Sequence, residues 1–509
     1  MPPRSVAVVG GGLAGLTAAY RLASRGARVT LLEPSRIGGW AQTQTYPVSF
    51  DRDGRHYKGE VTLEAGPRSI RPRGGPGAPA MLQLIHDLGL DDRIVPIPND
   101  HPAAKNRYLY DPDRGTLSAV HASPLALFNP RTAPAVRQLM LAFAMEPFRR
   151  SRPPKGDESV ASFFTRRFGA DVARTASAFV HGIYAADPAH LSLRSAFGIL
   201  HAAEKKAGSV VLGMLRGPRP KAEVDAETAA WAAIGPLGKA REGWSMYALR
   251  GGMGQLISGL EARARDAGVE FRKARVLRLS PDSRVNVETS YGPLRVDHVV
   301  AALPPPRLQR VLSAPLPHLS ANPSTTVGVV NVVLPLPPKD VHPNGFGYLI
   351  PRGGHNPEGA LGVIFDSTAL PGTDEGGLEG AVTKLTVMLG GPHWSSYGGV
   401  RVPAHDDELV PLALAHLQRA FPHLDGVHPL LTVANLNHAC IPTYAPGHGA
   451  RLRELHEAIG TGPWAGRLSV VGAGYGGVSV NDCVLGADLV AKSLDEGTVT
   501  GLERWAEWE

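Results

Sequence analysis

The sequence predicts an α/β protein of two or three domains that begins with a strand–helix–strand unit. Three observations lead to this fold class. The chain has 509 residues, which exceeds one ordinary hydrophobic core. Its hydrophobic and charged fractions, 43% and 19%, are typical of packed globular proteins. Its first residues alternate short apolar strands with a helical apolar stripe.

The first unit, residues 5–33, reads SVAVVGGGLAGLTAAYRLASRGARVTLLE. A short apolar strand leads into Gly10, Gly12 and Gly15, and a helix and a second strand follow. The first glycine permits a tight turn, the second lets backbone N–H groups approach a pyrophosphate, and the third lets helix and strand pack closely. Glu33 ends the second strand, where a carboxylate would accept hydrogen bonds from a ribose. This complete order predicts a dinucleotide site.

Two later segments distinguish FAD from NAD. Residues 37–44 read IGGWAQTQ and residues 63–69 read LEAGPRS. A second glycine turn after the ribose acid is common in flavoproteins of the amine-oxidase type, where a later strand ends near the flavin ring. Plain NAD dehydrogenases lack this extension. The glycines of the first unit alone would fit NAD, FAD or no ligand, so these segments carry the prediction of FAD.

The C-terminal part contains a second glycine-rich turn. Residues 468–483 read LSVVGAGYGGVSVNDC, which predicts a strand, a turn and a helix that begins near Val480. Free N–H groups at a helix N-terminus favour a phosphate or an electron-rich flavin carbonyl. Asn481 and Asp482 fit a capping role equally well, and the two roles do not exclude each other.

The charge and the cysteine content limit the partners. The net charge is +7 and the pI is about 9.4, which fits an anionic membrane surface, an anionic substrate or nucleic acid. No zinc-finger, RNP or basic-region pattern occurs, so we expect no nucleic-acid partner. The only cysteines, Cys440 and Cys483, exclude a disulfide framework and a cysteine-based zinc site. We therefore predict no metal site.

Two segments mix apolar and basic residues, as interfacial helices do. Residues 124–153 read PLALFNPRTAPAVRQLMLAFAMEPFRRSRP, and residues 199–221 repeat the mixture. Such segments suit shallow insertion into an anionic membrane surface. An ordinary helical domain with a solvated face fits the same pattern. No run of eighteen apolar residues occurs, so we expect any membrane attachment to be peripheral or monotopic.

The pattern of strands and helices predicts three domains. Ranges 1–90, 240–310 and 430–495 form a discontinuous dinucleotide-binding domain. Ranges 91–114 and 310–430, rich in strand patterns, form a substrate-binding domain, and range 115–239 forms a helical insert. We expect the final residues, GLERWAEWE, to be peripheral.

Further segments carry a family resemblance. They are NRYLY at 106–110, HGIYAADPAHLSLRSAF at 181–197, GFGYLIP at 345–351 and IPTYAPGH at 441–448. Together with GPRSIRP and GVSVNDC they resemble the oxygen-dependent protoporphyrinogen oxidase family over nearly the whole chain. Details such as IGGW look most like fungal members.

The resemblance implies a fold and a reaction. The fold is a Rossmann-like FAD-binding domain of the amine-oxidase type, with a mixed-sheet substrate domain and a helical membrane-binding insert. The reaction is oxidation of protoporphyrinogen IX to protoporphyrin IX, the penultimate step of haem synthesis. Non-covalent FAD takes hydride at N5 in three rounds, and oxygen reoxidises it with release of hydrogen peroxide. The resemblance supplies no side-chain general base, so no catalytic residue is assigned.

The resemblance also implies contacts with the cofactor. The residues that match FAD-contacting segments are Gly10, Gly11, Gly12, Leu13, Ala14, Gly15, Glu33, Pro34, Trp40, Gly66, Pro67, Arg68, Ser69, Val276, Ala473, Val478, Ser479 and Val480.

Four positions correspond to the family's substrate pocket, and three of them match it. Arg107 matches an arginine that pairs with a propionate, which suits a charge-assisted contact. Phe346 and Leu349 match a pair that sandwiches the macrocycle. Taken without the resemblance, these three are a surface arginine and two strand residues. Ala186 departs from the family, which has glycine there, and its methyl group is expected to crowd the pocket wall.

The resemblance implies partners and a location as well. They are protoporphyrinogen IX, molecular oxygen, a membrane surface, ferrochelatase and a second copy of the chain in a homodimer. The expected location is the mitochondrial inner membrane, without a cleaved transit peptide.

Three alternatives remain on the same fold. One is coproporphyrinogen III oxidase activity, since a single arginine does not distinguish two propionates from four. Another is an amine or polyamine oxidase, although the segment at 478–482 reads VSVND where those enzymes carry a V-E-G-A-type motif. The last is a non-enzymatic chaperone of prenylated GTPases, which would bind no flavin.

Overall fold

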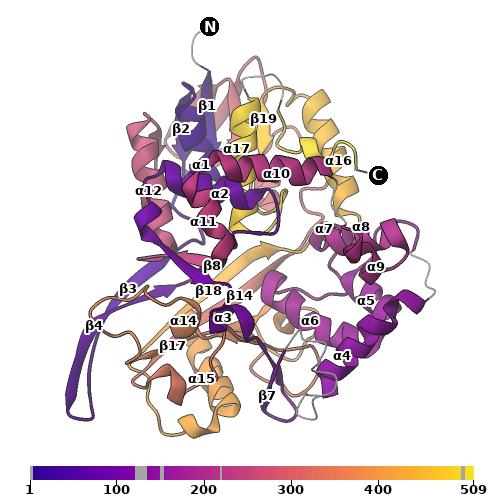
Figure 1. Ribbon diagram of the computed structural model, residues 1–509. Helices are drawn as coiled ribbons and strands as arrows, with labels where there is room; N and C mark the ends of the chain where they lie inside the picture. Colours follow the sequence, from indigo (N-terminus) through magenta and orange to yellow (C-terminus); the bar gives the residue numbers. More distant parts are fainter. Residues whose placement is uncertain (1–3, 121–133, 150–153, 218–220, 495–498, 509) are drawn as a thin grey trace.

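The computed structural model describes residues 4–120, 134–149, 154–217, 221–494 and 499–508 (Figure 1). Two large sheets form the body of the molecule. One is five-stranded, in the order β19-β13-β1-β2-β9, and the other is seven-stranded, in the order β18-β14-β17-β16-β15-β6-β7. A group of helices lies to one side of both (Figure 1). The α/β fold class predicted from the sequence is confirmed.

The five-stranded sheet is parallel throughout and collects strands from both ends of the chain. Its strands are β1 (Ser5–Val9), β2 (Arg28–Leu32), β9 (Glu270–Arg272), β13 (His298–Ala301) and β19 (Leu468–Val470). Because β1 pairs with β2 on one edge and β13 on the other, the glycine turn after β1 lies at the centre of the sheet edge.

Both faces of this sheet are covered, as expected for a parallel sheet. One apolar core lies under α1 (Leu13–Ala23), α2 (Gly77–Asp87), α12 (Met253–Asp266) and α17 (Val480–Ser493). A second core lies under α13 (Pro305–Val311), α16 (His448–Thr461) and a small sheet of β10 (Val276–Ser280), β11 (Val285–Thr289) and β12 (Gly292–Val296).

The seven-stranded sheet is mixed. Its strands are β6 (Tyr108–Asp111), β7 (Thr116–Ala119), β14 (Ser324–Leu334), β15 (Gly347–Leu349), β16 (Ala360–Ile364), β17 (Thr383–Gly390) and β18 (Leu431–Pro442). Helix α15 (Leu409–Ala420) packs on one face. The sheet extends past the substrate domain predicted from the sequence: β7 falls in the range expected for the insert, and β18 falls in a range expected for the dinucleotide domain. β7 pairs with β6 and β18 pairs with β14, and the sequence patterns of the two strands did not predict these pairings.

Short elements connect the two sheets. The hairpin of β3 (Thr43–Arg52) and β4 (Arg55–Glu64) projects from the body (Figure 1). A ribbon of β5 (Ile94–Pro98) and β8 (Trp244–Leu249) lies between the sheets. The one-turn helix α3 (Pro102–Lys105) follows β5 in the chain and contacts a second one-turn helix, α14 (Asp366–Ala369).

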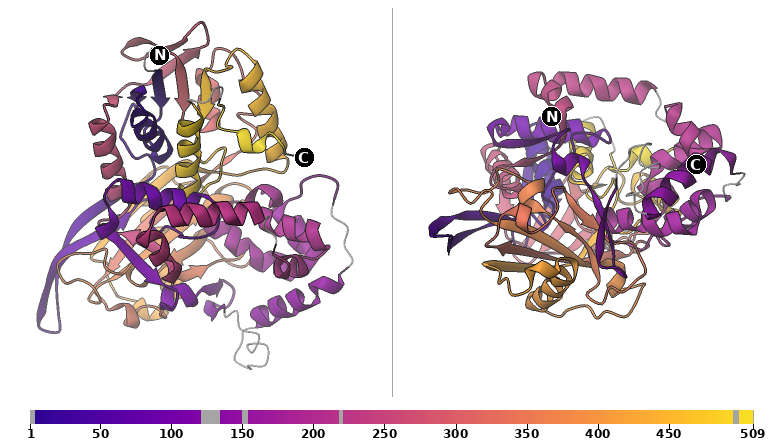
Figure 2. Two further views of the ribbon diagram at one scale, coloured as in Figure 1. Left: turned by 45° about the horizontal axis from the view of Figure 1, so that its top comes forward. Right: turned by 60° about the horizontal axis from the view of Figure 1, so that its bottom comes forward.

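The described part of the predicted insert is helical beyond β7. It contains α4 (Pro134–Met145), η3 (Glu146–Phe148), α5 (Val160–Phe168), α6 (Ala170–Tyr184), α7 (Leu193–Ala196), α8 (Gly198–Ala207) and α9 (Val210–Leu215). Helices α10 (Lys221–Ala233) and α11 (Pro236–Ala240) then return along α2 to β8 (Figure 2). We call the part from α4 to α9 the helical insert.

A buried charge holds the helical insert together. The carboxylate of Glu146, fully buried, pairs with the equally buried guanidinium of Arg167 on α5. It also accepts hydrogen bonds from the Ser209 hydroxyl (2.6 Å) and from the backbone N–H groups of Val210 (3.0 Å) and Val211 (3.1 Å) at the start of α9. A single carboxylate therefore ties η3, α5 and α9 to one another, because each of its lone pairs finds a donor.

Part of the predicted membrane-facing segment lies outside the described residues, including Leu125, Leu127, Phe128, Arg131, Arg150 and Arg152. Within the described ranges, no helix is long and apolar enough to cross a bilayer. The expectation for the last residues was wrong. Leu502 and Trp505 are buried against the core of the five-stranded sheet, because their apolar surface is removed from water there.

Candidate functional site

The glycine turn after β1 is shaped by close backbone contacts. A Cβ atom at Gly15 would lie 1.9 Å from the carbonyl oxygen of Gly10, and Gly10 itself has φ +107°. Helix α1 therefore packs directly against the end of β1. Gly12 is its N-cap residue and has no side chain to satisfy the first N–H groups, so these remain available to an anion. Leu13 and Ala14 are buried behind the turn.

The second glycine turn lies against the first. The N–H group of Gly38 donates to the carbonyl oxygen of Gly11 (2.8 Å). The Glu33 carboxylate, at the end of β2, accepts hydrogen bonds from the N–H groups of Gly11 (2.9 Å) and Ser35 (3.0 Å). Pro34 is exposed beside it. The acid predicted for the ribose thus lies at the mouth of the glycine turn.

The segment from Gly66 to Ser69 continues this wall. A Cβ atom at Gly66 would lie 2.2 Å from the carbonyl oxygen of Trp40, so only glycine allows the two segments to touch. Pro67 and Ser69 are half-buried in the same loop. The structure therefore brings the residues predicted at 10–15, 33–40 and 66–69 into one continuous backbone surface.

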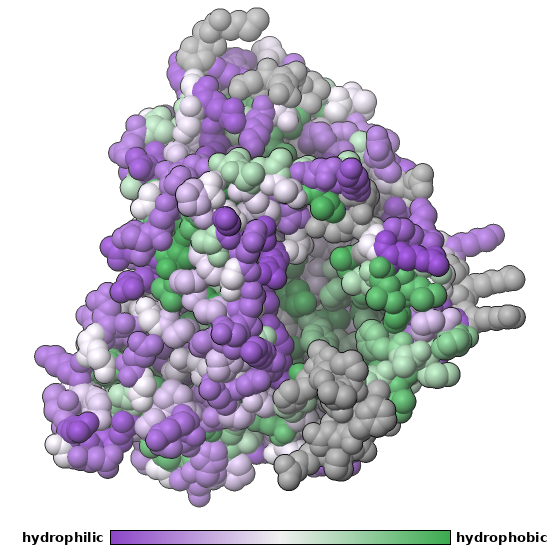
Figure 3. All heavy atoms as spheres, in the orientation of Figure 1, coloured by the Kyte–Doolittle hydropathy of each residue, from purple (hydrophilic) through white to green (hydrophobic). Residues whose placement is uncertain are grey.

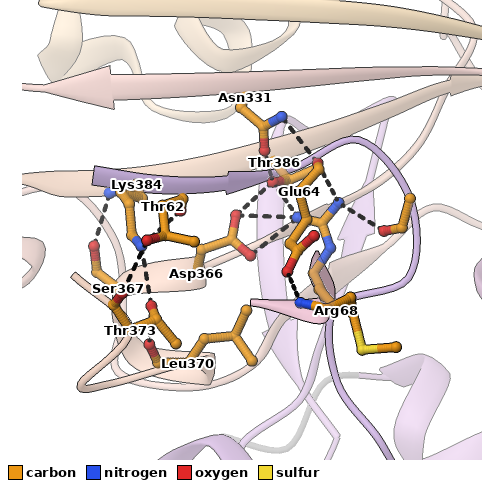
Figure 4. Close-up of polar contacts among 12 residues, drawn as sticks. Thr62, Glu64, Arg68, Asn331, Asp366, Ser367, Leu370, Thr373, Lys384 and Thr386 are labelled. Atoms are coloured by element: carbon orange, nitrogen blue, oxygen red, sulfur yellow. Dashed lines mark hydrogen bonds and ion pairs between the residues drawn. The ribbon is translucent and has the colours of Figure 1, made fainter. Parts of the chain in front are cut away.

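The Arg68 side chain points away from this surface into a buried polar network (Figure 4). Its guanidinium pairs with Asp366 of α14 (3.1 Å) and donates to the hydroxyl of Thr386 on β17. Both members of the ion pair are less than 9% exposed. Asn331 of β14 extends the network by donating to the carbonyl oxygen of Glu64 (3.0 Å). The loop beside the glycine turns is therefore bonded to the seven-stranded sheet.

Glu64 is a buried carboxyl at the other end of this loop. It accepts hydrogen bonds from the N–H group of Met253, at the start of α12, and from the hydroxyl of Thr43, both at 2.7 Å. Burial raises the pKa of Glu64 from 4.5 to about 7, and the hydrogen bonds and Arg68 only partly oppose this effect. Glu64 thus changes its charge near neutral pH.

The C-terminal glycine turn meets the first from the opposite side of the sheet edge. Helix α17 begins at Val480, which confirms the predicted start, and its N-cap is Ser479 rather than either residue proposed for capping. The Ser479 hydroxyl accepts from the N–H group of Asp482 (3.1 Å) and donates to the Asp482 carboxylate (2.6 Å). The Asn481 amide donates to the carbonyl oxygen of Arg71 (2.9 Å).

Two of the four predicted substrate residues lie together. The guanidinium carbon of Arg107 lies 5.3 Å from the centre of the Phe346 ring, because β6 and β15 are neighbouring parallel strands. Leu349 faces α6, where a Cβ atom at Gly182 would lie 2.7 Å from its side chain. Ala186 is buried in a cluster with Tyr184 and other residues of the insert, so its effect on a pocket wall stays a prediction.

Sequence reasoning missed Arg71. Burial lowers the pKa of its guanidinium, and the positive charge of nearby Arg107 lowers it further. Two like charges thus lie near each other, and because part of Arg71 is exposed to solvent, an anion can reach it. The signal was present in the sequence, because Arg71 is the second arginine of GPRSIRP, but nothing in the pattern showed that it would meet Arg107.

The arrangement fits FAD. Two helix N-termini, those of α1 and α17, lie at one sheet edge. Close backbone contacts at Gly15 and Gly66 hold the turns beside them in place, and a Cβ atom at Gly12 would meet only open space. The Oδ1 atom of Asn481 is buried without a hydrogen-bond partner in the described structure. Val276, predicted to contact the cofactor, is buried at the first position of β10. Among the described residues, no group of three or more His, Cys, Asp or Glu side chains is placed to hold a metal ion.

Replacing Glu64 with Gln should change how stability depends on pH. The unfolded chain releases the Glu64 proton near pH 4.5, while the folded protein keeps it to about pH 7. The folded state therefore binds more protons in this window, and its stability falls as the pH rises through it. Between pH 4.5 and 7, this effect lowers the free energy of unfolding of the wild type by up to about 3 kcal/mol, and we expect Glu64→Gln to lack this decrease.

The measurement is urea unfolding of wild type and variant at several pH values. Glu60→Gln, on the exposed side of the same strand, gives the background effect of removing a carboxylate. Parallel pH dependences for Glu64→Gln and wild type would contradict a raised pKa at this position.

Comparison with known proteins places the chain in a family. The model of the family "Flavin containing amine oxidoreductase" matches residues 13–494. The protoporphyrinogen oxidase of Schizosaccharomyces pombe is 34% identical, over 96% of this chain and 98% of that protein. The coproporphyrinogen III oxidase of Mycobacterium tuberculosis is 28% identical, over 97% of this chain and 98% of that protein.

Among solved structures, cyclohexylamine oxidase from Brevibacterium oxydans IH-35A has a TM-score of 0.64 at 18% identity, covering 97% of this chain and 99% of that one. This likeness concerns the fold. The family model and the S. pombe relative cover nearly the full chain, and FAD is the cofactor that the glycine turns and helix N-termini fit. The chain therefore belongs to the protoporphyrinogen oxidase family of flavin-containing amine oxidoreductases and is an FAD-dependent oxidase.

Proposed function

We propose that this enzyme oxidises protoporphyrinogen IX to protoporphyrin IX, the penultimate step of haem synthesis, with molecular oxygen as the electron acceptor. The observation that carries the proposal is the Arg107 guanidinium beside the Phe346 ring, with Arg71 as a second cation near Arg107. An aromatic face with one cation at its margin and a second cation near the first fits a large ring that bears two carboxylates.

The residues of the chain bind and orient the substrate in this proposal. Arg107 and Arg71 hold the two propionates, and the carboxylates in turn relieve the repulsion between the two guanidinium groups. Phe346 offers its ring to the macrocycle, and Leu349 supplies apolar surface from the adjacent strand. When bound, FAD supplies the hydride acceptor, and oxygen takes the electrons to give hydrogen peroxide. Substrate and product differ by six hydrogens, so three two-electron oxidations are required.

The number of arginines bears on the choice between two porphyrinogens. Coproporphyrinogen III has four carboxylates and protoporphyrinogen IX has two. The pairing of Arg107 with Arg71 matches two, because each guanidinium can hold one carboxylate through two parallel hydrogen bonds. The relationship to the M. tuberculosis enzyme keeps coproporphyrinogen III as the competing substrate to be tested.

An anaerobic reaction tests the proposed function. The purified holoenzyme is mixed with protoporphyrinogen IX under nitrogen, and the flavin absorbance is followed; air is then admitted and porphyrin fluorescence recorded. We expect bleaching, followed by recovery of the flavin and formation of porphyrin and hydrogen peroxide. A flavin that stays oxidised with protoporphyrinogen but bleaches with coproporphyrinogen III, or with an amine, would reject the proposed substrate.

The flavin is proposed to be non-covalent. The two thiols are Cys440 and Cys483, and burial raises the pKa of the first to about 11 and of the second to about 12. Thiols this weakly acidic are poor nucleophiles toward a flavin ring. Acid precipitation of the protein in the same experiment should therefore leave the yellow colour in the supernatant.

The two arginines should affect substrate binding more than the chemical step. Arg107→Met and Arg71→Met each remove a charged hydrogen-bond donor, worth about 1.5–3 kcal/mol. We expect KM for protoporphyrinogen IX to rise by about tenfold or more in each, with a smaller change in kcat, because binding to ground state and transition state is lost together. Steady-state fluorescence assays measure both constants.

The matched control for these variants is Arg278→Met, an exposed arginine on β10. It should leave KM unchanged. If Arg71→Met behaves like this control while Arg107→Met raises KM, a single arginine binds the substrate, and the argument for two propionates fails.

We also propose that the helical insert attaches the enzyme to a membrane surface. Apolar side chains gather on the insert (Figure 3). Phe148 is 77% exposed and Leu215 is 79% exposed, and other exposed apolar residues of the insert are Leu141, Met145, Ile199 and Met214. Exposed basic residues flank them at Arg149, Lys205, Lys206 and Arg216. Apolar residues with basic margins fit an anionic bilayer surface.

Binding to vesicles tests this attachment. The holoenzyme should co-sediment with phosphatidylcholine vesicles that contain an anionic phospholipid, and less with vesicles that lack it. Phe148→Glu and Leu215→Glu should each weaken binding by at least about tenfold, because an apolar contact is replaced by a charge. Tyr291→Glu, 81% exposed on the β11–β12 turn, is the control. If the wild type binds no vesicles but self-associates, and both variants lose this self-association, the exposed apolar residues form a protein interface instead.

The cellular setting proposed for this reaction is the mitochondrial inner membrane, with a homodimer that passes its product to ferrochelatase. It rests on the family resemblance and on the apolar character of the product, which favours transfer along a membrane surface. Fractionation of mitochondria and cross-linking to ferrochelatase would test it.

A further inference from the structure

The last described residues, 499–508, pack beside β19 and α16. The N–H group of Val470, at the end of β19, donates to the carbonyl oxygen of Thr500 (2.8 Å). The His456 ring of α16 bonds to the Thr500 hydroxyl (2.7 Å). Leu502 and Trp505 follow and are buried in the core below the five-stranded sheet. The segment is therefore held at a fixed place beside the C-terminal glycine turn. We call residues 499–508 the C-terminal tail.

Two side chains donate hydrogen bonds to the backbone of the C-terminal glycine turn, and one of them comes from the C-terminal tail. The guanidinium of Arg504 donates to the carbonyl oxygen of Gly476. The hydroxyl of Tyr444, at the end of the segment after β18, donates to the carbonyl oxygen of Ala473. Both carbonyls belong to the turn that leads into α17, and Ala473 is among the residues expected to contact FAD. The orientation of this turn is thus set by side chains from outside it.

Tyr444 and Arg504 are also connected to each other through a series of packed aromatic rings. The Tyr444 ring stacks on His448 with centres 4.3 Å apart and planes inclined by 4°. His448 in turn contacts the edge of Trp505 at 5.7 Å. The Arg504 guanidinium lies 4.5 Å from the centre of the Trp505 ring. Tyr444 and Arg504 therefore act as parts of one packed unit, since neither ring can shift without the next.

The far end of the C-terminal tail reaches the helical insert. The guanidinium of Arg194, on α7, lies 3.9 Å from the centre of the Trp508 ring. Arg453 donates to the carbonyl oxygen of Trp508 (2.8 Å), and Trp508 packs against Trp505 at 4.8 Å. A Cβ atom at Gly449 would lie 2.0 Å from the Trp508 ring, so glycine at this place lets α16 receive the indole.

The insert also contacts the glycine turn directly. Val478, another residue expected to contact FAD, packs against a cluster of the insert that includes Tyr184 and Leu191, and Tyr444 belongs to the same cluster. The turn is therefore enclosed between the insert on one side and the C-terminal tail on the other.

We propose that the C-terminal tail is a clasp that positions the flavin turn at 472–479 against the helical insert, with Arg504 as the positioning residue for FAD. A charge-assisted hydrogen bond from Arg504 fixes the Gly476 carbonyl. The N–H groups of the turn and the start of α17 then keep the orientation in which they meet the cofactor. The cation–π contact of Arg194 with Trp508 links the helical insert to the C-terminal tail, and through the tail to the same turn.

The first test compares Arg504→Met with Arg504→Lys in the full-length protein. FAD is removed and added back, and its dissociation constant is measured by quenching of flavin fluorescence. We expect a rise of about tenfold in Arg504→Met, the loss of one charged hydrogen bond, and a smaller rise in Arg504→Lys, which keeps a charged donor. The bound flavin should also change its absorption maximum and midpoint potential in Arg504→Met. Glu507→Gln, exposed in the same tail, should leave all three unchanged.

The second test asks whether the insert is coupled to the flavin through Trp508. Arg194→Gln, Trp508→Leu and the double variant form a cycle. A clasp requires each single variant to raise the FAD dissociation constant and the double variant to raise it by less than the product of the two.

Two results would overturn the proposal. The first is an Arg504→Met protein that unfolds at a lower temperature without FAD, yet binds FAD within twofold of the wild type and with an unchanged flavin spectrum; the tail would then serve stability alone. The second is a cycle in which the effects of Arg194→Gln and Trp508→Leu on FAD binding multiply, which would make the insert independent of the turn. Neither measurement uses the porphyrinogen, so failure of the proposed substrate would leave the outcome intact.

Discussion

The buried ion pair between Arg68 and Asp366 joins the two halves of this enzyme. Arg68 belongs to the loop that lines the cofactor surface, and Asp366 belongs to the helix that follows β16 of the substrate sheet. Removing two charges from water is expensive, so such a pair is favourable only when geometry and additional hydrogen bonds compensate. Here the Thr386 hydroxyl bonds to both members of the ion pair. This ion pair therefore helps to set the distance between the loop at 66–69 and the strands of the substrate sheet, together with the bonds from Asn331 to Glu64 and from Asn437 to Ala65.

The neighbouring Glu64 shows that the polar network selects one arrangement of the loop at 64–69 in addition to stabilising it. Its carboxyl lies at the N-terminus of α12 and on the same loop as Arg68, where ionisation is opposed by burial. A network that places an ion pair beside a carboxyl whose ionisation is suppressed by burial favours one arrangement of donors and acceptors. This constraint fixes the backbone of Gly66, which touches the second glycine turn at Trp40.

The sequence predicted the parts of the site that depend on local backbone geometry. Gly15 must be glycine because a carbonyl oxygen occupies the place of its Cβ atom, and that requirement is written in the spacing of the motif. The start of α17 at Val480 was predicted from the sequence of strand, glycine-rich turn and helix at 468–483. Contacts between distant segments were not predictable in this way. Arg71 meets Arg107, and Arg504 meets Gly476, only because separate strands and helices converge, and no local pattern records that convergence.

The roles of single polar residues were the least predictable. Ser479, not Asn481 or Asp482, caps α17, because the Asn481 amide is engaged by the Arg71 carbonyl and Asp482 bonds to Ser479 itself. The final residues looked peripheral because they are few and partly charged. Their two tryptophans instead pack against α16 and each other, which is a tertiary effect.

The order of strands in the five-stranded sheet has a consequence for synthesis of the enzyme. Strand β1 is made first, but its neighbour β13 comes almost 300 residues later and the edge strand β19 near the end. Closing loops of this length is slow, and parallel pairing over such separations exposes apolar strands in the meantime. The complete cofactor surface therefore forms only after nearly all of the chain, including α17, has been synthesised.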